Sequence, residues 1–295
     1  MILVKNMKEV LDFYKETGMY TNYEGFKDYF ISLPDDFNVL MELIRDNIIH
    51  RVTLRNSYED KNEISLKYPW YKYRCDDDIL LTAPAMMAEL FRQDKRGLIM
   101  GRKIEDKIVV TCRYVSVLTA SILKAKGYAV RIRSGFAPWI RKNEACDHWI
   151  CEYYNMEEKR WISYDVDEQL HDHKSKKLIF AAQAWLDVRA GKRDLNYFVH
   201  GSNIRGVAML ARSVFYDFHA LMNDEISYLF FPVYIDKDKE FFDLSPDQLK
   251  EIDDLATLCL EPDKNFDEIR YLFKNDKRLR VINTPLINDK EHLEI

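Results

Sequence analysis

Apolar residues recur at three- and four-residue spacing in several parts of this chain, a pattern that predicts amphipathic helices. Pro34-Asp-Asp marks a helix start just before one such stretch. The stretch that begins at Cys112 reaches Gly127, and glycine suits the position after a helix end because it tolerates a left-handed backbone. We expect helices over residues 10–14, 37–44, 84–91, 112–127, 181–190 and 206–229, and one or two more over residues 245–273.

The middle third of the chain is strand-like. Residues 128–137 alternate with period two, residues 147–154 are rich in aromatics, and residues 160–165 follow a polar turn. The last two stretches are expected to form an antiparallel hairpin. The predicted fold class is therefore α+β, with a central helix packed on an antiparallel sheet and helical extensions on both sides.

Composition narrows the class of protein. Hydrophobic residues make up 47% and charged residues 32% of the 295 positions, which is ordinary for a soluble globular protein. The formal net charge of −5 argues against nucleic-acid binding, which usually needs a basic surplus. The N-terminus becomes charged too early for a signal peptide, and nowhere do about eighteen apolar residues run together, so we expect no membrane span.

The cysteines favour a reducing compartment. They are odd in number and form no dense framework, which suits the cytoplasm, where a free thiolate persists. The five are Cys75, Cys112, Cys146, Cys151 and Cys259. We therefore expect a cytoplasmic protein.

Cys112, His148 and Asp165 together suit nucleophilic attack on an amide or ester carbonyl. Cys112 is expected at a helix start with Thr111 as candidate N-cap, where the amides of the first turn favour a thiolate and can hold an oxyanion. His148 would take the thiol proton and pass it to the leaving group, while Asp165 would bind the other ring nitrogen. The hairpin would bring His148 and Asp165 together as cross-strand neighbours.

Each of these residues also has an ordinary structural explanation. A free cysteine is commonly a small buried hydrophobe, a histidine beside Trp149 is commonly a semi-buried residue, and an aspartate near a strand end commonly belongs to a turn. The combination favours catalysis, because the three residue types come in one ordered block. Asp167 points the same way as Asp165 on an extended strand, and we favour Asp165 from its spacing to Trp161 and from the hairpin geometry.

A second group of residues suggests zinc ligands: Cys146, His148, Cys151, His171 and His173. On a strand, however, Cys146 and His148 face one side and Cys151 faces the other, and no second Cys-x-x-Cys pair completes a structural site. We therefore expect no metal and no cofactor.

A later helical stretch carries Asp217, His219 and Glu225. Positions 217 and 219 diverge by roughly 200 degrees around a helix, so they cannot share a face. We expect a charged helix surface here rather than an acid–base cluster.

The block around Cys112 resembles the transglutaminase-like superfamily, a branch of the papain-like thiol enzymes. In that family a cysteine begins a helix that reads roughly C-x-x-x-A-x-L-x-x-x-L-x-x-x-G-[IY]-x-[AV]-R, and here the sequence is CRYVSVLTASILKAKGYAVR, ending at Arg131 and followed by Ser134-Gly-Phe. The family's His-x-Trp-x-x-[EV] strand is matched loosely from His148, where the Trp directly follows the His. Its Trp-x-x-x-Asp strand matches Trp161-Ile-Ser-Tyr-Asp165.

The three motifs occur in the family's order and span about residues 107–169. The flanks, at residues 184–191 and 217–225, resemble an uncharacterised bacterial group of transglutaminase-like proteins. Eukaryotic members tend to have Gly-Gln before the nucleophile, whereas Val110-Thr111 precedes it here, so the second oxyanion donor is unassigned. No internal repeat, low-complexity tract or Gly/Ser linker marks a boundary, so we expect one transglutaminase-like domain over residues 1–295, with a catalytic core at about 84–170 and helical extensions at 1–83 and 171–295.

The leading hypothesis is thiol-dependent acyl transfer or hydrolysis at an amide or peptide bond, with a peptide or small amide as substrate. Water as acceptor would make a peptidase, amidase or deamidase, and we favour it over an amine acceptor, which would make a cross-linker. The alternative is a non-catalytic protein of this fold that binds a peptide or protein partner. The sequence leaves the oligomeric state open.

Overall fold

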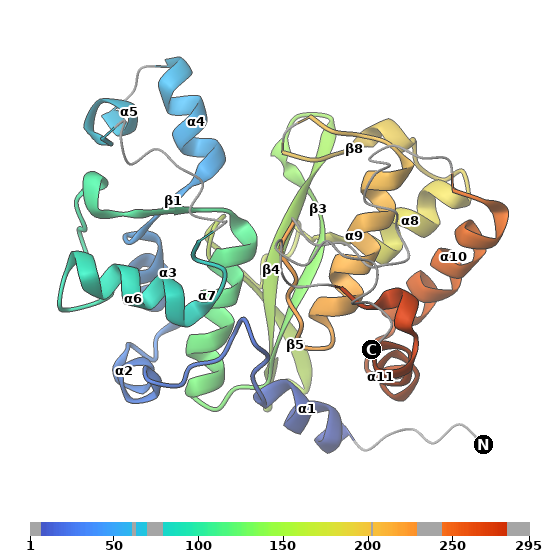
Figure 1. Cartoon of the computed structure of the whole chain (residues 1–295), viewed down its shortest axis with the longest axis horizontal. Coiled ribbons are helices and arrows are strands. Elements are labelled where there is room, and N and C mark those ends of the chain that lie inside the picture. Colours follow the sequence, from blue (N-terminus) through green and yellow to red (C-terminus); the bar gives the residue numbers. More distant parts are fainter. Residues whose placement is uncertain (1–6, 61–62, 70–78, 202, 229–243, 282–295) are drawn as a thin grey trace, which may run out of the picture. The chain divides into compact units, whose positions relative to one another are not determined.

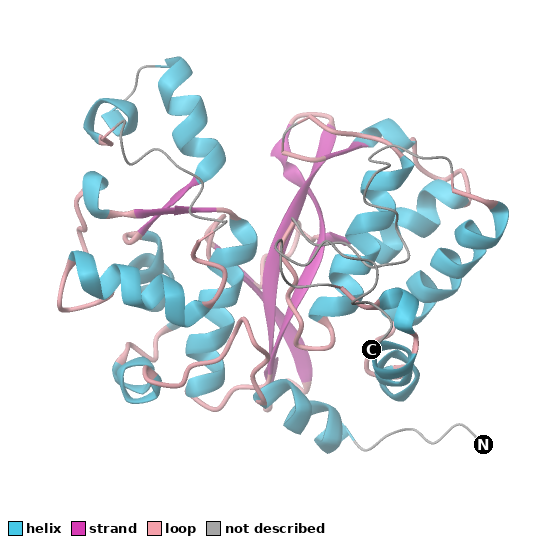
Figure 2. Cartoon of the chain, in the orientation of Figure 1, coloured by secondary structure: helices cyan, strands magenta, loops and turns pink. Residues whose placement is uncertain are grey.

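The computed structural model describes residues 7–60, 63–69, 79–201, 203–228 and 244–281 (Figure 1). Cys75 therefore lies outside the described residues. Helices and strands are both abundant (Figure 2). The helices are α1 (Met7–Lys15), α2 (Lys27–Ser32), α3 (Phe37–Arg45), α4 (Arg51–Asp60), α5 (Glu63–Lys67), α6 (Ala83–Gln93), α7 (Cys112–Ala125), α8 (Ala181–Arg189), α9 (Val207–Ala220), α10 (Pro246–Leu260) and α11 (Phe266–Asn275).

The strands build a mainly antiparallel sheet. They are β1 (Ile48–His50), β2 (Ile108–Val110), β3 (Val130–Arg141), β4 (Glu144–Asn155), β5 (Arg160–Asp165), β6 (Leu170–His171), β7 (Ile179–Phe180) and β8 (Phe198–Val199). Within the described residues the main sheet has the order β6-β5-β4-β3-β7, with β8 paired to β4, while β1 and β2 form a separate parallel pair. The chain combines helices with an antiparallel sheet, as the predicted α+β class requires.

The predicted elements agree with the structure in most places. The hairpin between residues 147–154 and 160–165 is confirmed, since β4 pairs with β5 from Cys151–Tyr164 to Asn155–Arg160. The helix start before residue 37 is also confirmed, because Asp36 accepts hydrogen bonds from the backbone amides at positions 38 and 39. The helix predicted over 206–229 is too long, since α9 ends at Ala220.

The described residues divide into two compact units. The Cys112 unit comprises residues 11–133 and 148–177. The second unit comprises the described residues of 1–10, 134–147 and 178–295. The expectation of one domain over residues 1–295 stays a prediction.

The central element of the Cys112 unit is α7. All its residues are buried, and it meets β4 through two hydrogen bonds: Ser116 Oγ donates to the Trp149 carbonyl at 3.1 Å, and the Cys151 thiol donates to the Ser116 carbonyl at 3.2 Å. Gly127, at φ 92°, ends the helix as predicted. The amide of Gly127 bonds to Lys124 O and that of Tyr128 to Leu123 O, which satisfies carbonyls of the last turn.

The second unit packs α8, α9 and α10 against one another (Figure 1). Its strand pair β3–β7 requires glycine at position 135, because a Cβ there would lie 2.3 Å from the Ile179 carbonyl oxygen. The glycine of the Gly135-Phe136 pair thus has a steric reason in this chain, although the strand does not end there but continues to Arg141.

The expected charged surface of α9 is wrong. Asp217, His219 and Glu225 are no more than 1% exposed. Asp217 accepts a 2.9 Å hydrogen bond from the Ser134 amide, and the His219 ring lies 2.8 Å from Asp224 Oδ2 and 2.7 Å from the Leu279 carbonyl. Because buried polar groups need such partners, Asp217 and His219 hold local structure together.

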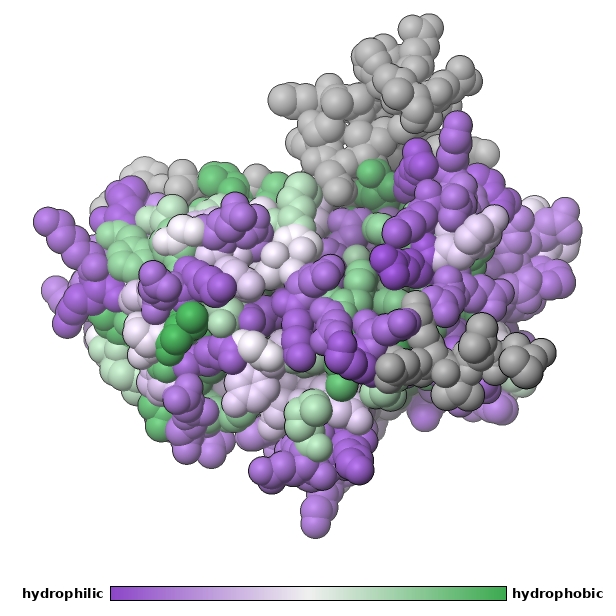
Figure 3. Space-filling model, turned by 90° about the horizontal axis from the view of Figure 1, so that it is seen from below, coloured by the Kyte–Doolittle hydropathy of each residue, from purple (hydrophilic) through white to green (hydrophobic). Residues whose placement is uncertain are grey.

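The surface drawn in Figure 3 is mostly hydrophilic, and hydrophobic residues interrupt it in small areas. Exposed hydrophobic side chains such as Met19, Leu66 and Met156 come from separate elements or turns. Among the described helices, none has the length and apolar character that crossing a bilayer requires.

Candidate active site

Cys112 is the first residue of α7 and follows β2 after the single residue Thr111. Its side chain is buried, with 5% of the residue exposed. Thr111 has the extended backbone of an N-cap, but its side chain makes no capping hydrogen bond. The sulfur therefore lies at the positive end of the helix dipole, which favours a thiolate.

His148 and Asp165 lie in contact beside this cysteine. His148 Nε2 is 2.7 Å from Asp165 Oδ2, and the two residues are 2% and 4% exposed. The second carboxylate oxygen of Asp165 accepts the amide of Glu168 at 3.1 Å, so both oxygens have partners. His148 also forms a hydrogen bond with the Cys112 sulfur. Because Nε2 faces the Asp165 carboxylate, Nδ1 is the ring nitrogen that can interact with this sulfur. The structure thus brings the three predicted residues together, while their catalytic role stays a prediction.

The contact between His148 and Asp165 differs in detail from the expected cross-strand pair. The pairing of β4 with β5 ends at Cys151–Tyr164. Continued by three residues on each strand, it would set His148 opposite Asp167 and leave Asp165 as a diagonal neighbour. Diagonal neighbours still meet through long side chains. The chain turns after Asp165, so Asp167 leaves the strand and is not the aspartate that binds His148.

A second histidine, His50, also acts on Cys112, and no sequence motif points to it. His50 is the last residue of β1, which pairs in parallel with β2 so that His50 lies opposite Val110. Two residues after Val110 the chain reaches Cys112. The register of two short strands therefore brings His50 to the thiol, with which it forms a hydrogen bond.

Asp167 is the acidic partner of His50. Its Oδ2 lies 3.6 Å from His50 Nε2, which is an ion-pair distance and too long for a hydrogen bond. On the other side of the ring, the amide of Val52 donates to Nδ1 at 3.2 Å. The His50 side chain is 21% exposed, so it is the more accessible of the two histidines. Cys112 thus interacts with the histidines of two His–Asp pairs.

These neighbours change the protonation of the thiol. Burial raises the pKa of Cys112, but hydrogen bonds and charges from His148 and His50 lower it below its ordinary value. Burial lowers the pKa of His148, yet the Asp165 carboxylate and Cys112 raise it well above the usual range. Burial likewise lowers the pKa of His50, and Asp167 with Cys112 raises it to about 9. The site therefore favours a thiolate beside protonated imidazole.

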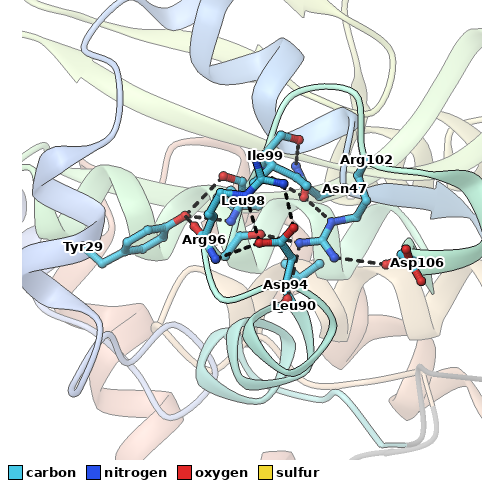
Figure 4. A network of polar contacts seen from close by, with 10 residues as sticks. Tyr29, Asn47, Leu90, Asp94, Arg96, Leu98, Ile99, Arg102 and Asp106 are labelled. Atoms are coloured by element: carbon cyan, nitrogen blue, oxygen red, sulfur yellow. Dashed lines mark hydrogen bonds and ion pairs between the residues drawn. The ribbon is translucent and has the colours of Figure 1, made fainter.

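A polar network around Arg102 holds the start of β1 (Figure 4). The Arg102 guanidinium, with 4% of the residue exposed, donates to Asn47 Oδ1 at 2.6 Å and to the Gly97 carbonyl. Asn47 in turn donates to the Ile99 carbonyl at 2.9 Å, and its own carbonyl accepts the amide of Ile108 in β2. Because Asn47 directly precedes β1, this network positions the strand that ends in His50.

Arg45 binds the turn that carries Asp167. It ends α3 and donates to the carbonyl of Asp167. With the Gln169 amide turned about its axis, Gln169 oxygen also accepts from Arg45 at 2.9 Å. The turn that carries Asp167 is therefore tied to α3.

The residues considered as zinc ligands have other partners. Cys151 donates to Ser116, His171 Nε2 lies 2.8 Å from the Tyr153 hydroxyl, and His173 Nδ1 accepts the amide of Lys176. The Cys146 thiol is directed at Asp147 Oδ1, 3.7 Å away. Across the part of the chain that the structure describes, no three His, Cys, Asp or Glu residues gather as a metal-binding group.

Comparison with protein-family models, curated proteins and solved structures finds no match to this chain. The geometry of Cys112, His148 and Asp165 is therefore the observation on which a functional conclusion depends. The His50–Asp167 pair beside the same thiol is a second feature of this unit.

Proposed function

We propose that the protein is a thiol-dependent acyl-transfer enzyme with a transglutaminase-like core, acting on an amide or peptide bond. The observation that carries this proposal is the arrangement of Cys112 at the start of a buried helix, hydrogen-bonded to His148, whose Nε2 lies 2.7 Å from Asp165. A nucleophile, a base and a group that orients the base form the set that covalent catalysis requires.

The chemistry follows from the protonation of the site. The Cys112 thiolate adds to the substrate carbonyl carbon, and the carbonyl π electrons move onto oxygen. The tetrahedral intermediate collapses as the bond to the leaving amine breaks, and protonated His148 donates its proton to that amine. Asp165 holds Nε2 and stabilises the charged imidazole until that transfer. A thioester on Cys112 and a free amine result.

Water then resolves the thioester in the reaction that we favour. Neutral His148 takes a proton from water, hydroxide adds to the thioester carbonyl, and the thiolate leaves. The product is a carboxylic acid, so the enzyme class is a peptidase, amidase or deamidase. Resolution by an amine would instead give a cross-linker by the same steps.

The internal contacts of the motif residues also support a transglutaminase-like core. Arg131, at the end of the helix motif, donates to Glu152 of the histidine strand at 2.7 Å. The Arg131 guanidinium lies 4.0 Å from the ring centroid of Trp161, which begins the aspartate motif. Residues of the three motifs thus contact one another through Arg131.

Alkylation by iodoacetamide tests the proposal. Cys112 and Cys146 are similarly buried, at 5% and 6% exposure, but the Cys146 sulfur faces a carboxylate, which does not stabilise a thiolate. Peptide mapping after brief treatment at neutral pH should find Cys112 modified much faster, and His148→Gln should remove most of this advantage. Equal rates at the two cysteines would contradict an activated nucleophile. Fast alkylation without turnover of peptides, amides or esters would favour a binding protein.

A further inference from the structure

Attack by a thiolate creates a negative charge on the carbonyl oxygen, and this oxyanion needs hydrogen-bond donors. A backbone amide at the start of α7 can serve as one donor. A glutamine side chain before the cysteine cannot be the second, because Val110 and Thr111 precede Cys112 in this chain. We infer that His50 supplies the second donor, through Nε2–H, and is a catalytic residue of the acyl-transfer reaction. This inference rests on the proposed function.

The hydrogen bonds of the His50 ring fix which nitrogen can donate. The amide of Val52 donates to Nδ1, so in the neutral ring the hydrogen is on Nε2. In the protonated ring Nε2 keeps its hydrogen and Nδ1 gains one, at the expense of the bond from Val52. Nε2 is therefore a donor in both protonation states, and the role does not depend on the charge of the ring.

The two aspartates explain why the histidines have different roles. Asp165 lies 2.7 Å from His148 Nε2 and accepts its hydrogen, which fixes His148 as a base through Nδ1. Asp167 is 3.6 Å from His50 Nε2, beyond hydrogen-bond distance, so it acts on the ring through its charge without accepting the hydrogen. The Nε2–H of His50 thus remains available to an acceptor at the sulfur.

Exposure also separates the two rings. His148 is 2% exposed, whereas the His50 side chain is 21% exposed and contacts the same thiol. Of the two rings, His50 is therefore the one that a substrate oxygen arriving from solvent can contact. The buried ring is protected from bulk water, as suits a proton carrier.

The negative charge moves from the sulfur to the carbonyl oxygen during the attack. In the resting site His50 interacts with the thiolate, where the negative charge resides, and because Nδ1 accepts from Val52 we take Nε2–H as the donor. As the sulfur–carbon bond forms, the thiolate charge disappears and the carbonyl π pair becomes the oxyanion. The Nε2–H then donates to that oxygen, and when the intermediate collapses the pair reforms the carbonyl bond. His50 neither gains nor loses a proton in this step.

Two reactions at the same sulfur separate this role from an effect on thiol ionisation. Alkylation by iodoacetamide needs a thiolate but forms no oxyanion. Acylation by p-nitrophenyl acetate also needs the thiolate, and it passes through an oxyanion that must be stabilised. The two rates should be compared at about pH 9.5, above the ordinary thiol pKa of about 8.5. His50→Ala should lower the acylation rate by about 10²- to 10³-fold and the alkylation rate by less than about tenfold. His50→Gln, which keeps an N–H donor, should recover part of the acylation rate.

His173→Ala is the matched control, because this histidine is exposed and bonds locally to Ser175 and Lys176. Both of its rates should equal those of the wild type. If His50→Ala lowers acylation and alkylation by the same factor, or changes neither, the inference is wrong while the proposed function stands. Wild-type protein that alkylates at Cys112 but is acylated by no ester overturns the proposed function and the inference with it. The unfolding midpoints of both His50 variants show whether a lower rate is caused by loss of structure. If His50→Gln is as stable as the wild type but recovers no acylation, the inference is also wrong.

Discussion

Asp165 and Asp167 are two residues apart in the chain, but their carboxylates serve different histidines. Asp165 closes β5 and lies 2.7 Å from His148, whereas Asp167 belongs to the following turn and lies 3.6 Å from His50. The two aspartates therefore do not compete for one histidine in this chain. Each has its own imidazole, and both imidazoles contact Cys112.

Asp165→Asn should raise the pKa of the Cys112 thiol. Burial lowers the pKa of His148 and the Asp165 carboxylate raises it, so without that charge the imidazolium that stabilises the thiolate is weaker. The pH profile of Cys112 alkylation should move upward, toward the ordinary thiol value of about 8.5. Acylation should fall further than alkylation, by about 10²-fold or more, because the ring also loses its correct tautomer. An unchanged alkylation profile would contradict the role of Asp165.

The same substitution should have a pH-dependent effect on stability. A group whose pKa is raised by folding contributes its full stabilisation at pH values below its pKa in the unfolded chain, which is about 6.5 for histidine. This stabilisation is lost as the pH rises through the pKa of the group in the folded protein. Asp165→Asn should therefore lower the urea midpoint more at about pH 6 than at about pH 10.

Asp172→Asn is the control for that measurement. A hydrogen bond from Arg160 lowers the pKa of Asp172, so its contribution is complete above about pH 3.9 and constant over the range tested. Its effect on the midpoint should be the same at both pH values. A larger effect of Asp165→Asn at the alkaline end would contradict the account of His148.

Much of the fold could be predicted from sequence because its signals are local. The apolar repeat and terminal glycine of α7, the polar turn between β4 and β5, and the N-cap before α3 lie within a few residues of the elements that they define. The same holds for Cys112, His148 and Asp165, which come in one block of the chain.

His50 could not be found in this way. β1 has three residues, too few for a periodic pattern, and its partner β2 lies about sixty positions later, so no local feature reveals their parallel register. The only signal is a short apolar pair, Ile48-Ile49, directly before a histidine. The position of Asp167 differs from the expected one because the chain turns after Asp165 and does not continue as an extended strand.

Arg102→Ala should destabilise the protein by about 2–4 kcal/mol, because it leaves buried carbonyls and Asn47 without their cationic donor. It should also slow acylation of the remaining folded protein, since β1 loses the network that positions His50. Denaturant unfolding and ester acylation measure the two effects. Arg96→Ala removes a guanidinium from the same loop, but one whose side chain is 73% exposed, and should leave the unfolding midpoint unchanged. Equal effects of the two substitutions would contradict a structural role for the buried network.

Glu152→Ala should destabilise the protein by about 3–5 kcal/mol, because Arg131 and Arg133 would keep buried charges without their carboxylate. Glu157→Ala, in the exposed turn of the same hairpin, provides the control and should leave the midpoint unchanged. Denaturant unfolding measures both variants. Wild-type stability of Glu152→Ala would show that this cluster does not hold the three motifs together.

The most direct measurement of the central claim is detection of an acyl group on Cys112. The protein should be mixed with p-nitrophenyl acetate, quenched in acid within the first turnover, and analysed by intact mass and peptide mapping. We expect one acetyl group per chain, located on Cys112, absent from Cys112→Ala and strongly reduced in His148→Gln. Acetylation that is spread over other residues, or that persists in Cys112→Ala, would contradict the proposal that this thiol is the nucleophile.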